Sequence, residues 1–210
     1  MKRKHPIIIG LTGGVGMGKS TVANALARMG VPVHRADETV HALLAPGGAA
    51  VGPVAQHFPP ALITQGGARA IAAIDRKKLG AMVFNNPPAL RGLEKILHPM
   101  VAASRKKFLR QHARARVVVF DIPLLFEAGL QREVDEIWLL VATPRVQRQR
   151  VLARAGMTSA RLHAILRQQW PHARKIKNTR GTPTRIIRTD GARKQWQHTV
   201  AKLLALCPRA

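Results

Sequence analysis

The chain carries the sequence IIIGLTGGVGMGKST at residues 7–21. Its first three residues are β-branched and apolar, which is typical of a buried parallel strand. The pattern G-x-x-x-x-G-K-[ST] follows at residues 13–20, and residues 21–29 place apolar side chains on one helical face. Strand, glycine-rich loop and helix in this order predict half of a βαβ unit that carries a phosphate-binding P-loop.

The residue types of this loop indicate nucleotide chemistry. Glycines let successive backbone N–H groups form a nest for an anion, and the helix that begins near Lys19 adds the positive end of its dipole. We expect Lys19 to reach the β- and γ-phosphates and the Ser20 hydroxyl to bind Mg²⁺. The alternative is a glycine-rich turn with an incidental lysine. The expected ATP-binding residues are Gly13, Gly14, Val15, Gly16, Met17, Gly18, Lys19, Ser20 and Thr21.

Length and composition narrow the class of protein. With 210 residues, of which 46% are hydrophobic, the chain can build the core of one globular unit with an inserted subdomain. The single cysteine, Cys207, excludes a disulfide scaffold and argues against a cysteine-rich zinc site. The apolar run at residues 7–11 is too short for a signal peptide or a membrane span. We therefore expect a soluble cytoplasmic protein.

The charge balance is strongly positive, with 35 Lys and Arg against 10 Asp and Glu, a net charge of +25. Such a chain attracts polyanions, so a nucleic-acid-binding P-loop ATPase is one alternative function. Aromatic residues make up only 4% of the chain, and the sequence carries no recognisable RNA- or DNA-binding motif, which argues against that alternative. We expect adventitious polyanion binding and no membrane association.

Strand and helix patterns alternate along the rest of the chain, which predicts an α/β fold with a parallel sheet of about five strands and helices on both faces. The further strands are expected at residues 31–33, 117–120, 136–141 and 185–187. The further helices are expected at residues 37–44, 145–155, 159–169 and 192–206. Residues 49–110 read as mostly helical and free of strands, broken at 58–60 and 85–88. That stretch is too long for a simple crossover and predicts a helical insertion that binds substrate.

Two carboxylates follow predicted strands, at the edge of a parallel sheet that faces the ligand crevice. Asp37 could orient and deprotonate an acceptor hydroxyl, or it could cap the helix that begins at Glu38. Asp121 could hold Mg²⁺ in the manner of a Walker-B acid, or it could cap the loop before Ile122. The residue types alone leave both choices open.

The segment from Ile137 to Thr189 contains twelve Lys and Arg and no acidic residue. Arg150 and Arg154 are four residues apart and share one helical face. They belong either to a lid that closes over the transferring phosphoryl group or to a solvated basic face. Further upstream, His98 and Pro99 predict the end of a helix, with a capping or packed histidine as the alternative role for His98.

From about Ile7 to Gly191 the chain resembles the dephospho-CoA kinases. Three matching segments are residues 10–23, Ala36-Asp37 and His98-Pro99, and the most distinctive one is DIPLLFE at residues 121–127. Single-residue matches in and after the lid are Gln147, Arg150, Arg154, Gln169, Pro171 and Lys175. A kinase for a nucleoside monophosphate or a small alcohol is the nearest rival, and the DIPLLFE segment argues against it.

The resemblance implies Mg²⁺-dependent transfer of the ATP γ-phosphate to the ribose 3′-hydroxyl of dephospho-CoA, the last step of coenzyme A biosynthesis. We expect a monomer or weak oligomer. The resemblance also implies a P-loop core (1–40, 113–142 and 183–210), a helical CoA-binding region (41–112) and a lid (143–182). The implied catalytic residues are Asp37 as base, Lys19, and Arg150 near the phosphates. The implied acceptor-side residues are Asp37, Thr12 and His98, the lid residues Arg150 and Arg154, and the metal-binding residues Ser20 and Asp121.

The sequence departs from the family pattern at three places. Arg35 stands where family members usually carry an Asp two residues before Asp37. Pro183-Thr184 replaces the Ala-Asp pair expected before the last strand, and Arg188 replaces an acid after it. Lys19, Ser20 and Asp37 are unaffected, so we expect an active enzyme.

Overall fold

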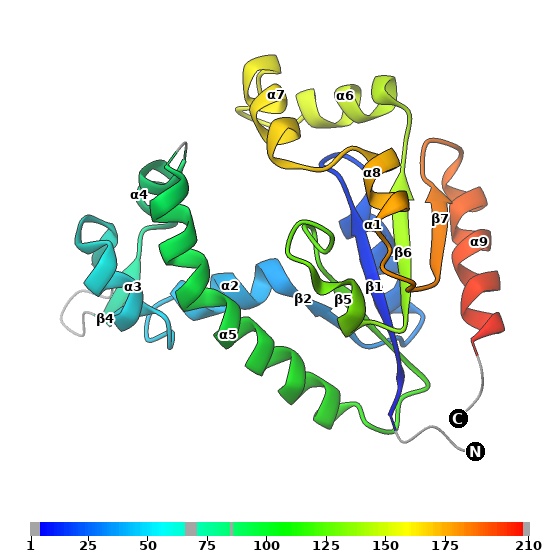
Figure 1. The fold of residues 1–210 in the computed structure, drawn as a ribbon, viewed down its shortest axis with the longest axis horizontal. Coiled ribbons are helices and arrows are strands. Elements are labelled where there is room, and N and C mark those ends of the chain that lie inside the picture. Colours follow the sequence, from blue (N-terminus) through cyan, green and yellow to red (C-terminus); the bar gives the residue numbers. More distant parts are fainter. Residues whose placement is uncertain (1–4, 66–70, 85, 208–210) are drawn as a thin grey trace. The chain divides into compact units, whose positions relative to one another are not determined.

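The computed structural model of the chain describes residues 5–65, 71–84 and 86–207 (Figure 1). It contains two compact units: the first is formed by Met1–His34 and Leu109–Ala210, and the second by Arg35–Phe108. Residues 143–182 belong to the first unit, and their movement as a separate lid stays a prediction. Within the described ranges no helix is both long enough and apolar enough to cross a lipid bilayer.

A five-stranded sheet with the strand order β2-β5-β1-β6-β7 forms the centre of the first unit. Its strands are β1 (Ile7–Gly13), β2 (Val33–Arg35), β5 (Val117–Asp121), β6 (Glu136–Val141) and β7 (Thr184–Arg188). Strand β1 pairs in parallel with β5 and β6, and β6 pairs in parallel with β7. The predicted fold class and strand number are thereby confirmed.

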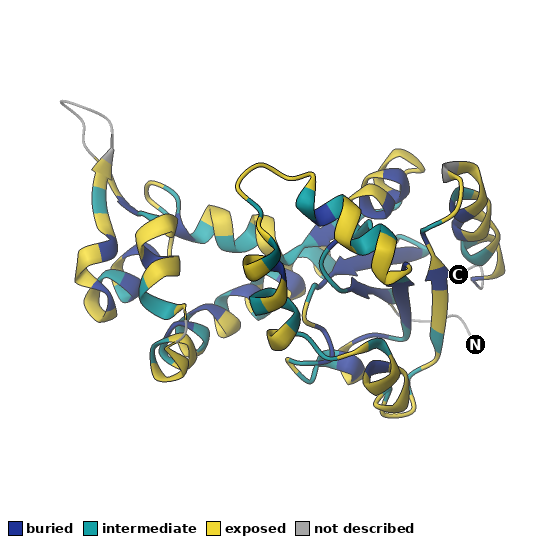
Figure 2. Ribbon diagram, turned by 90° about the horizontal axis from the view of Figure 1, so that it is seen from above, coloured by how far each residue is buried: buried dark blue, intermediate teal, exposed yellow. Residues whose placement is uncertain are grey.

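One face of this sheet packs against helices α1 (Lys19–Arg28) and α9 (Arg193–Leu206). Alternate strand residues such as Ile9 and Trp138 form a buried cluster with Leu26 of α1 and Val200 of α9. The inner strands are almost entirely buried, whereas the edge strand β7 is largely exposed (Figure 2). This is the pattern expected for parallel strands that are covered on both faces.

The segment that follows β5 covers the opposite face. Gly10 of β1 lies against it, and a Cβ at Gly10 would come within 2.6 Å of Leu125 Cδ1. Glycine at this position therefore allows the close approach, and Leu125 and Phe126 are buried there. The remaining elements of this unit are the 3₁₀ helix η3 (Leu130–Glu133) and the helices α6 (Pro144–Leu152), α7 (Ser159–Gln168) and α8 (His172–Lys177).

Besides shifts of a residue or so at other element ends, the first unit differs from the prediction at β2, at α6 and at α8. Strand β2 begins two residues later than predicted because Pro32 has no N–H to donate, although its carbonyl accepts from Val119 N–H at 2.9 Å. Helix α6 ends at Leu152, so Arg154 lies beyond it. The short helix α8 was not predicted; it begins directly after Pro171.

The second unit has its own apolar core, which includes Leu44, Val54, Phe58, Leu79 and Leu97. Its helices are α2 (Ala36–Leu44), α3 (Val51–His57), α4 (Arg76–Val83) and α5 (Pro87–Gln111), with a 3₁₀ turn η1 (Pro59–Ala61). Its strands β3 (Leu62–Gln65) and β4 (Ile71–Ile74) pair antiparallel.

The prediction that residues 49–110 contain no strand is wrong, because β3 and β4 form a two-stranded sheet there. Each strand is a short run that contains β-branched residues, and Gly66-Gly67 stands between the two runs in the sequence. Such a pattern is a hairpin signal. It was missed because runs of four residues are too short to separate from helix by periodicity. The helical stretch was also expected to break at residues 85–88, and Asn85 of this break lies outside the described residues.

The prediction that a helix ends at His98-Pro99 is also wrong, since α5 continues through Pro99 to Gln111. Proline removes one backbone hydrogen bond and normally disfavours the helix interior. Here Leu93, Leu97 and Val101 are buried at a spacing of four residues. Burial of this stripe along one helix face offsets the lost hydrogen bond.

Candidate active site

The P-loop connects β1 to α1 and has the backbone conformation that its glycines permit. Gly16 and Gly18 have φ values of 77°, in the left-handed region. A Cβ at Gly16 would lie 2.7 Å from Val151 Cγ2 and 3.0 Å from the Gln147 carbonyl oxygen of α6. Glycine is therefore required at this point both by conformation and by space. Lys19 and Ser20 form the first two positions of α1, where backbone N–H groups are free of intrahelical partners.

Lys19 forms an ion pair with Asp121 at the end of β5. The distance from Nζ to Oδ1 is 2.6 Å, and the two side chains are 14% and 7% exposed. The structure thus brings together the lysine predicted for phosphate binding and the carboxylate predicted for the metal. It also argues against a purely loop-capping role for Asp121. Thr12 is buried in β1, the strand that leads into the P-loop, and its Oγ1 donates to the Pro123 carbonyl at 3.1 Å.

Arg150 lies against the backbone of the P-loop. Its Nη1 donates to Thr189 Oγ1 at 3.1 Å and to the Gly16 carbonyl at 3.4 Å, and its Nη2 donates to the Thr189 carbonyl at 2.5 Å. The Thr189 hydroxyl donates in turn to the Met17 carbonyl at 3.0 Å. These contacts are not those of a solvated basic face, because the guanidinium is engaged on the loop itself.

A cavity of about 330 Å³ opens beside the P-loop. The P-loop and three helices contribute to its lining: Gly18 from the loop, Thr21 from α1, Arg150 from α6 and Trp196 from α9. Arg154 also reaches this cavity although it lies beyond the end of α6. The P-loop and both arginines that were predicted for the lid therefore line the same cavity.

Asp37 lies in the first turn of α2, and Arg35 occupies the N-cap position. Asp37 is exposed, and its carboxylate makes no hydrogen bond within the part of the chain that the structure describes. The N-cap alternative for Asp37 is therefore wrong. His98 is exposed on α5. Both residues belong to the second unit whereas Lys19 belongs to the first, so their meeting in one active site stays a prediction.

The two arginines that depart from the family pattern, Arg35 and Arg188, have acidic partners nearby. Arg35 pairs with Glu38 at 3.1 Å, and Arg188 pairs with Asp190 at 3.0 Å. The hydrogen bond from Arg188 lowers the pKa of the Asp190 carboxyl, which keeps it ionised at neutral pH. Asp190 also accepts from the Thr143 N–H at 3.1 Å, just before α6. The acid missing at 188 is thus present two residues later, where it ties β7 to α6.

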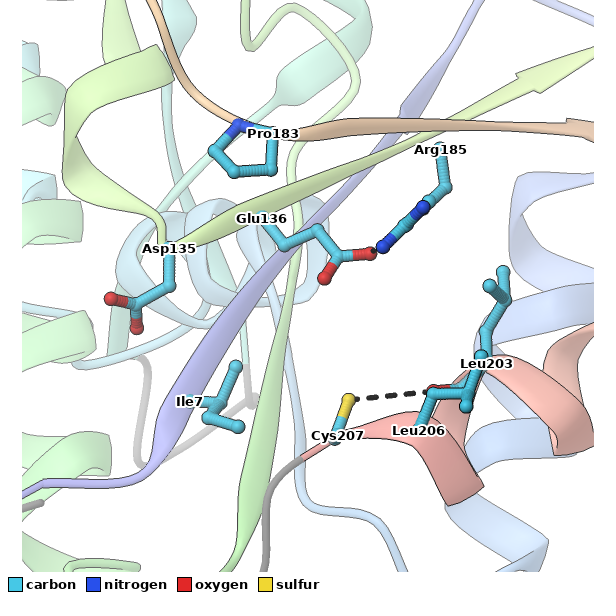
Figure 3. A pocket seen from close by; sticks show the side chains of 8 residues that line it. All are labelled: Ile7, Asp135, Glu136, Pro183, Arg185, Leu203, Leu206 and Cys207. Carbon is cyan, nitrogen blue, oxygen red and sulfur yellow. Dashed lines mark hydrogen bonds and ion pairs between the residues drawn. The ribbon is translucent and has the colours of Figure 1, made fainter.

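A second cavity, of about 250 Å³, lies where β6 and β7 begin (Figure 3). Strand β1 begins at Ile7 beside this cavity and ends at Gly13 in the P-loop, so the cavity lies at the other end of the strands from the P-loop. It contains Cys207, whose Sγ donates to the Leu203 carbonyl at 3.5 Å, and the ion pair of Arg185 with Glu136 at 3.2 Å. Burial raises the pKa of the Cys207 thiol, so the thiol stays protonated at neutral pH. A protonated thiol is a poor nucleophile, and we assign no chemistry to this cavity.

Three side chains around the P-loop received no role from the residue patterns. Gln147 and Gln169 contact Val15, and Thr189 contacts Met17. The two glutamines were among the family matches, which was the only signal for them. Thr189 carried no signal, because its contact joins residues 172 positions apart.

Comparison with known proteins identifies the family. The family model for dephospho-CoA kinase matches residues 7–183. The chain belongs to the dephospho-CoA kinase family. A dephospho-CoA kinase from Cereibacter sphaeroides is 48% identical over 187 residues, 89% of each chain. One from Bradyrhizobium diazoefficiens is 42% identical over 204 residues, 96% of this chain and 98% of the relative.

A solved structure shares the fold of this chain. The crystal structure of TT1252 from Thermus thermophilus has a TM-score of 0.79 and 32% identity, and the alignment covers 96% of this chain and 98% of that one. Membership of the dephospho-CoA kinase family confirms the resemblance found in the sequence and the enzyme class, a kinase that phosphorylates an alcohol group. It favours the small-molecule kinase over the nucleic-acid-binding ATPase.

The position of Arg150 in this kinase gives a prediction. Arg150→Ala should lower kcat by about tenfold or more, and more than it raises KM for ATP, if the guanidinium acts on the transition state. Loss of its bonds to Thr189 and Gly16 should also lower the melting temperature by about 3 °C. Steady-state kinetics with ATP varied give both parameters.

Arg145→Ala, an exposed arginine on the same helix, is the matched control and should behave like the wild type. A pure KM effect in Arg150→Ala would make Arg150 a ground-state binder of ATP. Unchanged kinetics would assign it to the support of the loop alone.

Proposed function

We propose that this chain transfers the γ-phosphate of ATP to the ribose 3′-hydroxyl of dephospho-CoA, giving CoA and ADP. The observation that carries the proposal is the P-loop with Lys19 paired to Asp121 in a chain whose family is dephospho-CoA kinase. Such a site binds a nucleotide phosphate and keeps a carboxylate beside it. The identity of the acceptor rests on the family.

In this proposal each residue has a separate task. The backbone N–H groups of the loop and the Lys19 ammonium bind the β- and γ-phosphates. Asp37 takes the proton of the acceptor hydroxyl while the hydroxyl oxygen bonds to the γ-phosphorus. At the same time the bond between the γ-phosphorus and the bridging oxygen breaks, and ADP leaves. Arg150 offsets the charge of the transferring group. Asp37 is exposed, and none of the described residues forms a hydrogen bond with its carboxylate, which supports its role as a base that accepts the acceptor's proton.

Ser20 and Asp121 would hold Mg²⁺. The described residues contain no group of three or more His, Cys, Asp or Glu side chains suited to a metal. Mg²⁺ keeps several waters and takes only one or two protein ligands together with phosphate oxygens, so one hydroxyl and one carboxylate are a sufficient set of donors. When bound, the ion neutralises charge on the β- and γ-phosphate oxygens. In this proposal Lys19 turns from Asp121 to the phosphates when the nucleotide binds, and the Asp121 carboxylate then faces the ion.

The cavity beside the P-loop is our candidate for the nucleotide base. The Trp196 ring and the two arginines that line it offer apolar and cationic surfaces, and both suit a planar heterocycle. We further propose that the enzyme works in the cytoplasm as a monomer or weak oligomer, since the reaction needs only ATP and a soluble acceptor.

An ADP-release assay with several acceptors tests the proposed function. With ATP and Mg²⁺ present, dephospho-CoA should support turnover, while AMP, CMP and shikimate should support little. Omission of Mg²⁺ should abolish the reaction. Turnover with AMP or shikimate that equals turnover with dephospho-CoA would contradict the assigned acceptor.

The basic surface should bind polyanions only weakly. We attribute most of the net charge of +25 to solvent-facing arginines and lysines. Affinity for a single-stranded RNA should therefore fall by orders of magnitude, about 10³-fold if six or more phosphates are contacted, between 50 and 200 mM salt. Filter binding across a salt series measures this slope. Tight binding that resists salt and selects a sequence would contradict it.

A further inference from the structure

Two glutamine side chains hold the tip of the P-loop. Gln147 Nε2 donates to the Val15 carbonyl at 2.8 Å, and the Val15 N–H donates to Gln169 Oε1 at 3.0 Å. Both backbone polar groups of Val15 thus have side-chain partners, which lie 132 and 154 residues further along the chain. We refer to this arrangement as the Val15 clamp.

The chemistry of the clamp suits glutamine. One side of it must donate a hydrogen bond and the other must accept one, and a neutral amide can do either without adding charge. An ionised glutamate could replace Gln169 as acceptor but could not replace Gln147 as donor. Neutrality matters here because the loop forms a nest for the phosphates of the nucleotide.

Each glutamine is itself held in place. Gln147 belongs to α6, whose N-terminus is capped by the Thr143 hydroxyl. Gln169 is followed by Trp170, whose N–H donates to Glu127 Oε1 at 2.7 Å. The same oxygen lies 3.1 Å from the Nζ of Lys175, a fully buried side chain. A buried ammonium is stable only beside such a partner.

The clamp therefore joins three parts of the first unit. The P-loop is bonded to α6 through Gln147, and to the joint between α7 and α8 through Gln169. That joint is bonded to the segment after β5 through Glu127. Residues 144–177 carry both glutamines. The conformation of Val15 and the packing of this segment against the P-loop therefore depend on each other.

We propose that Gln147 and Gln169 are positioning residues. They give the P-loop its ATP-binding conformation only while the segment 144–177 is packed against the loop. The inference rests on the proposed function, in that ATP is taken as the ligand of the loop. It adds a requirement that Lys19 and the glycines do not supply. Loss of the clamp should impair binding of the phosphates more than binding of the base.

Two variants of Gln169 test the clamp by titration with Mg²⁺-ATP and with adenosine. Gln169→Ala removes one hydrogen bond and should weaken ATP binding about fivefold. Gln169→Glu keeps the acceptor but places a negative charge beside the loop. It should weaken ATP binding about tenfold or more, with a melting temperature close to that of the wild type. Adenosine carries no phosphate, so its affinity should change less than twofold in either variant.

Gln168→Glu is the matched control, since Gln168 is the exposed neighbour and its substitution makes the same change in charge. It should bind ATP like the wild type. Equal ATP affinities of Gln169→Glu and Gln168→Glu, or equal losses for ATP and adenosine in Gln169→Ala, would overturn the inference. Turnover of dephospho-CoA by the wild type is a separate measurement, so failure of the proposed function would be recognised independently.

Discussion

Lys19→Met should lower the turnover of dephospho-CoA by about 10²-fold or more. The ammonium that neutralises charge developing on the β- and γ-phosphates is lost, and no other lysine belongs to the loop at residues 13–21. Turnover at saturating ATP, measured well below the melting temperature, gives the effect. Near-normal turnover would contradict the assignment of the P-loop.

Lys19 also forms an ion pair with Asp121, so the variant needs a control that separates a loss of stability from a loss of catalysis. Both partners are largely buried, so removal of the cation takes the ammonium partner from the Asp121 carboxylate and should cost about 3 kcal/mol of stability. The double variant Lys19→Met with Asp121→Asn removes both charges and should regain much of the lost melting temperature. Its turnover should stay low. Recovery of turnover together with stability would show that Lys19 acts only by supporting the fold.

Asp37→Asn should abolish most phosphoryl transfer while leaving ATP affinity nearly unchanged. An amide has the shape of the carboxylate but cannot accept the proton of the ribose hydroxyl. The side chain is exposed in the first turn of α2, where loss of a negative charge costs only about 0.5 kcal/mol through the helix dipole. Melting temperature and turnover measured on the same variant separate a catalytic effect from a structural one.

Glu38→Gln provides the matched control for that experiment. Glu38 is the neighbouring exposed carboxylate in the same helical turn and pairs with Arg35. Its substitution removes the same charge from the helix N-terminus, so the two variants should have similar melting temperatures. Only Asp37→Asn should lose turnover. Wild-type turnover in Asp37→Asn would refute the catalytic base.

Much of the fold could be predicted because its signals are local. The strand, loop and helix around the P-loop follow from β-branched residues, glycines and an apolar stripe, all within 30 residues. The errors arose where local rules compete with packing. Pro99 predicted the end of a helix, but the buried stripe of Leu93, Leu97 and Val101 carries α5 onward. Strands β3 and β4 are too short for their period to be recognised.

The nucleotide-binding loop, the parallel sheet and the kinase family could be predicted from the residues alone, because they depend on residue types at fixed short spacings. The side chains that surround the loop could not, because they come from distant parts of the chain that meet only in the fold. Lys19 finds Asp121 across 102 residues, Val15 finds Gln169 across 154, and the Glu127–Lys175 pair anchors the joint beside it. Such contacts are set by the order in which strands pair and helices pack, and no pattern along the chain encodes a distance between residues so far apart.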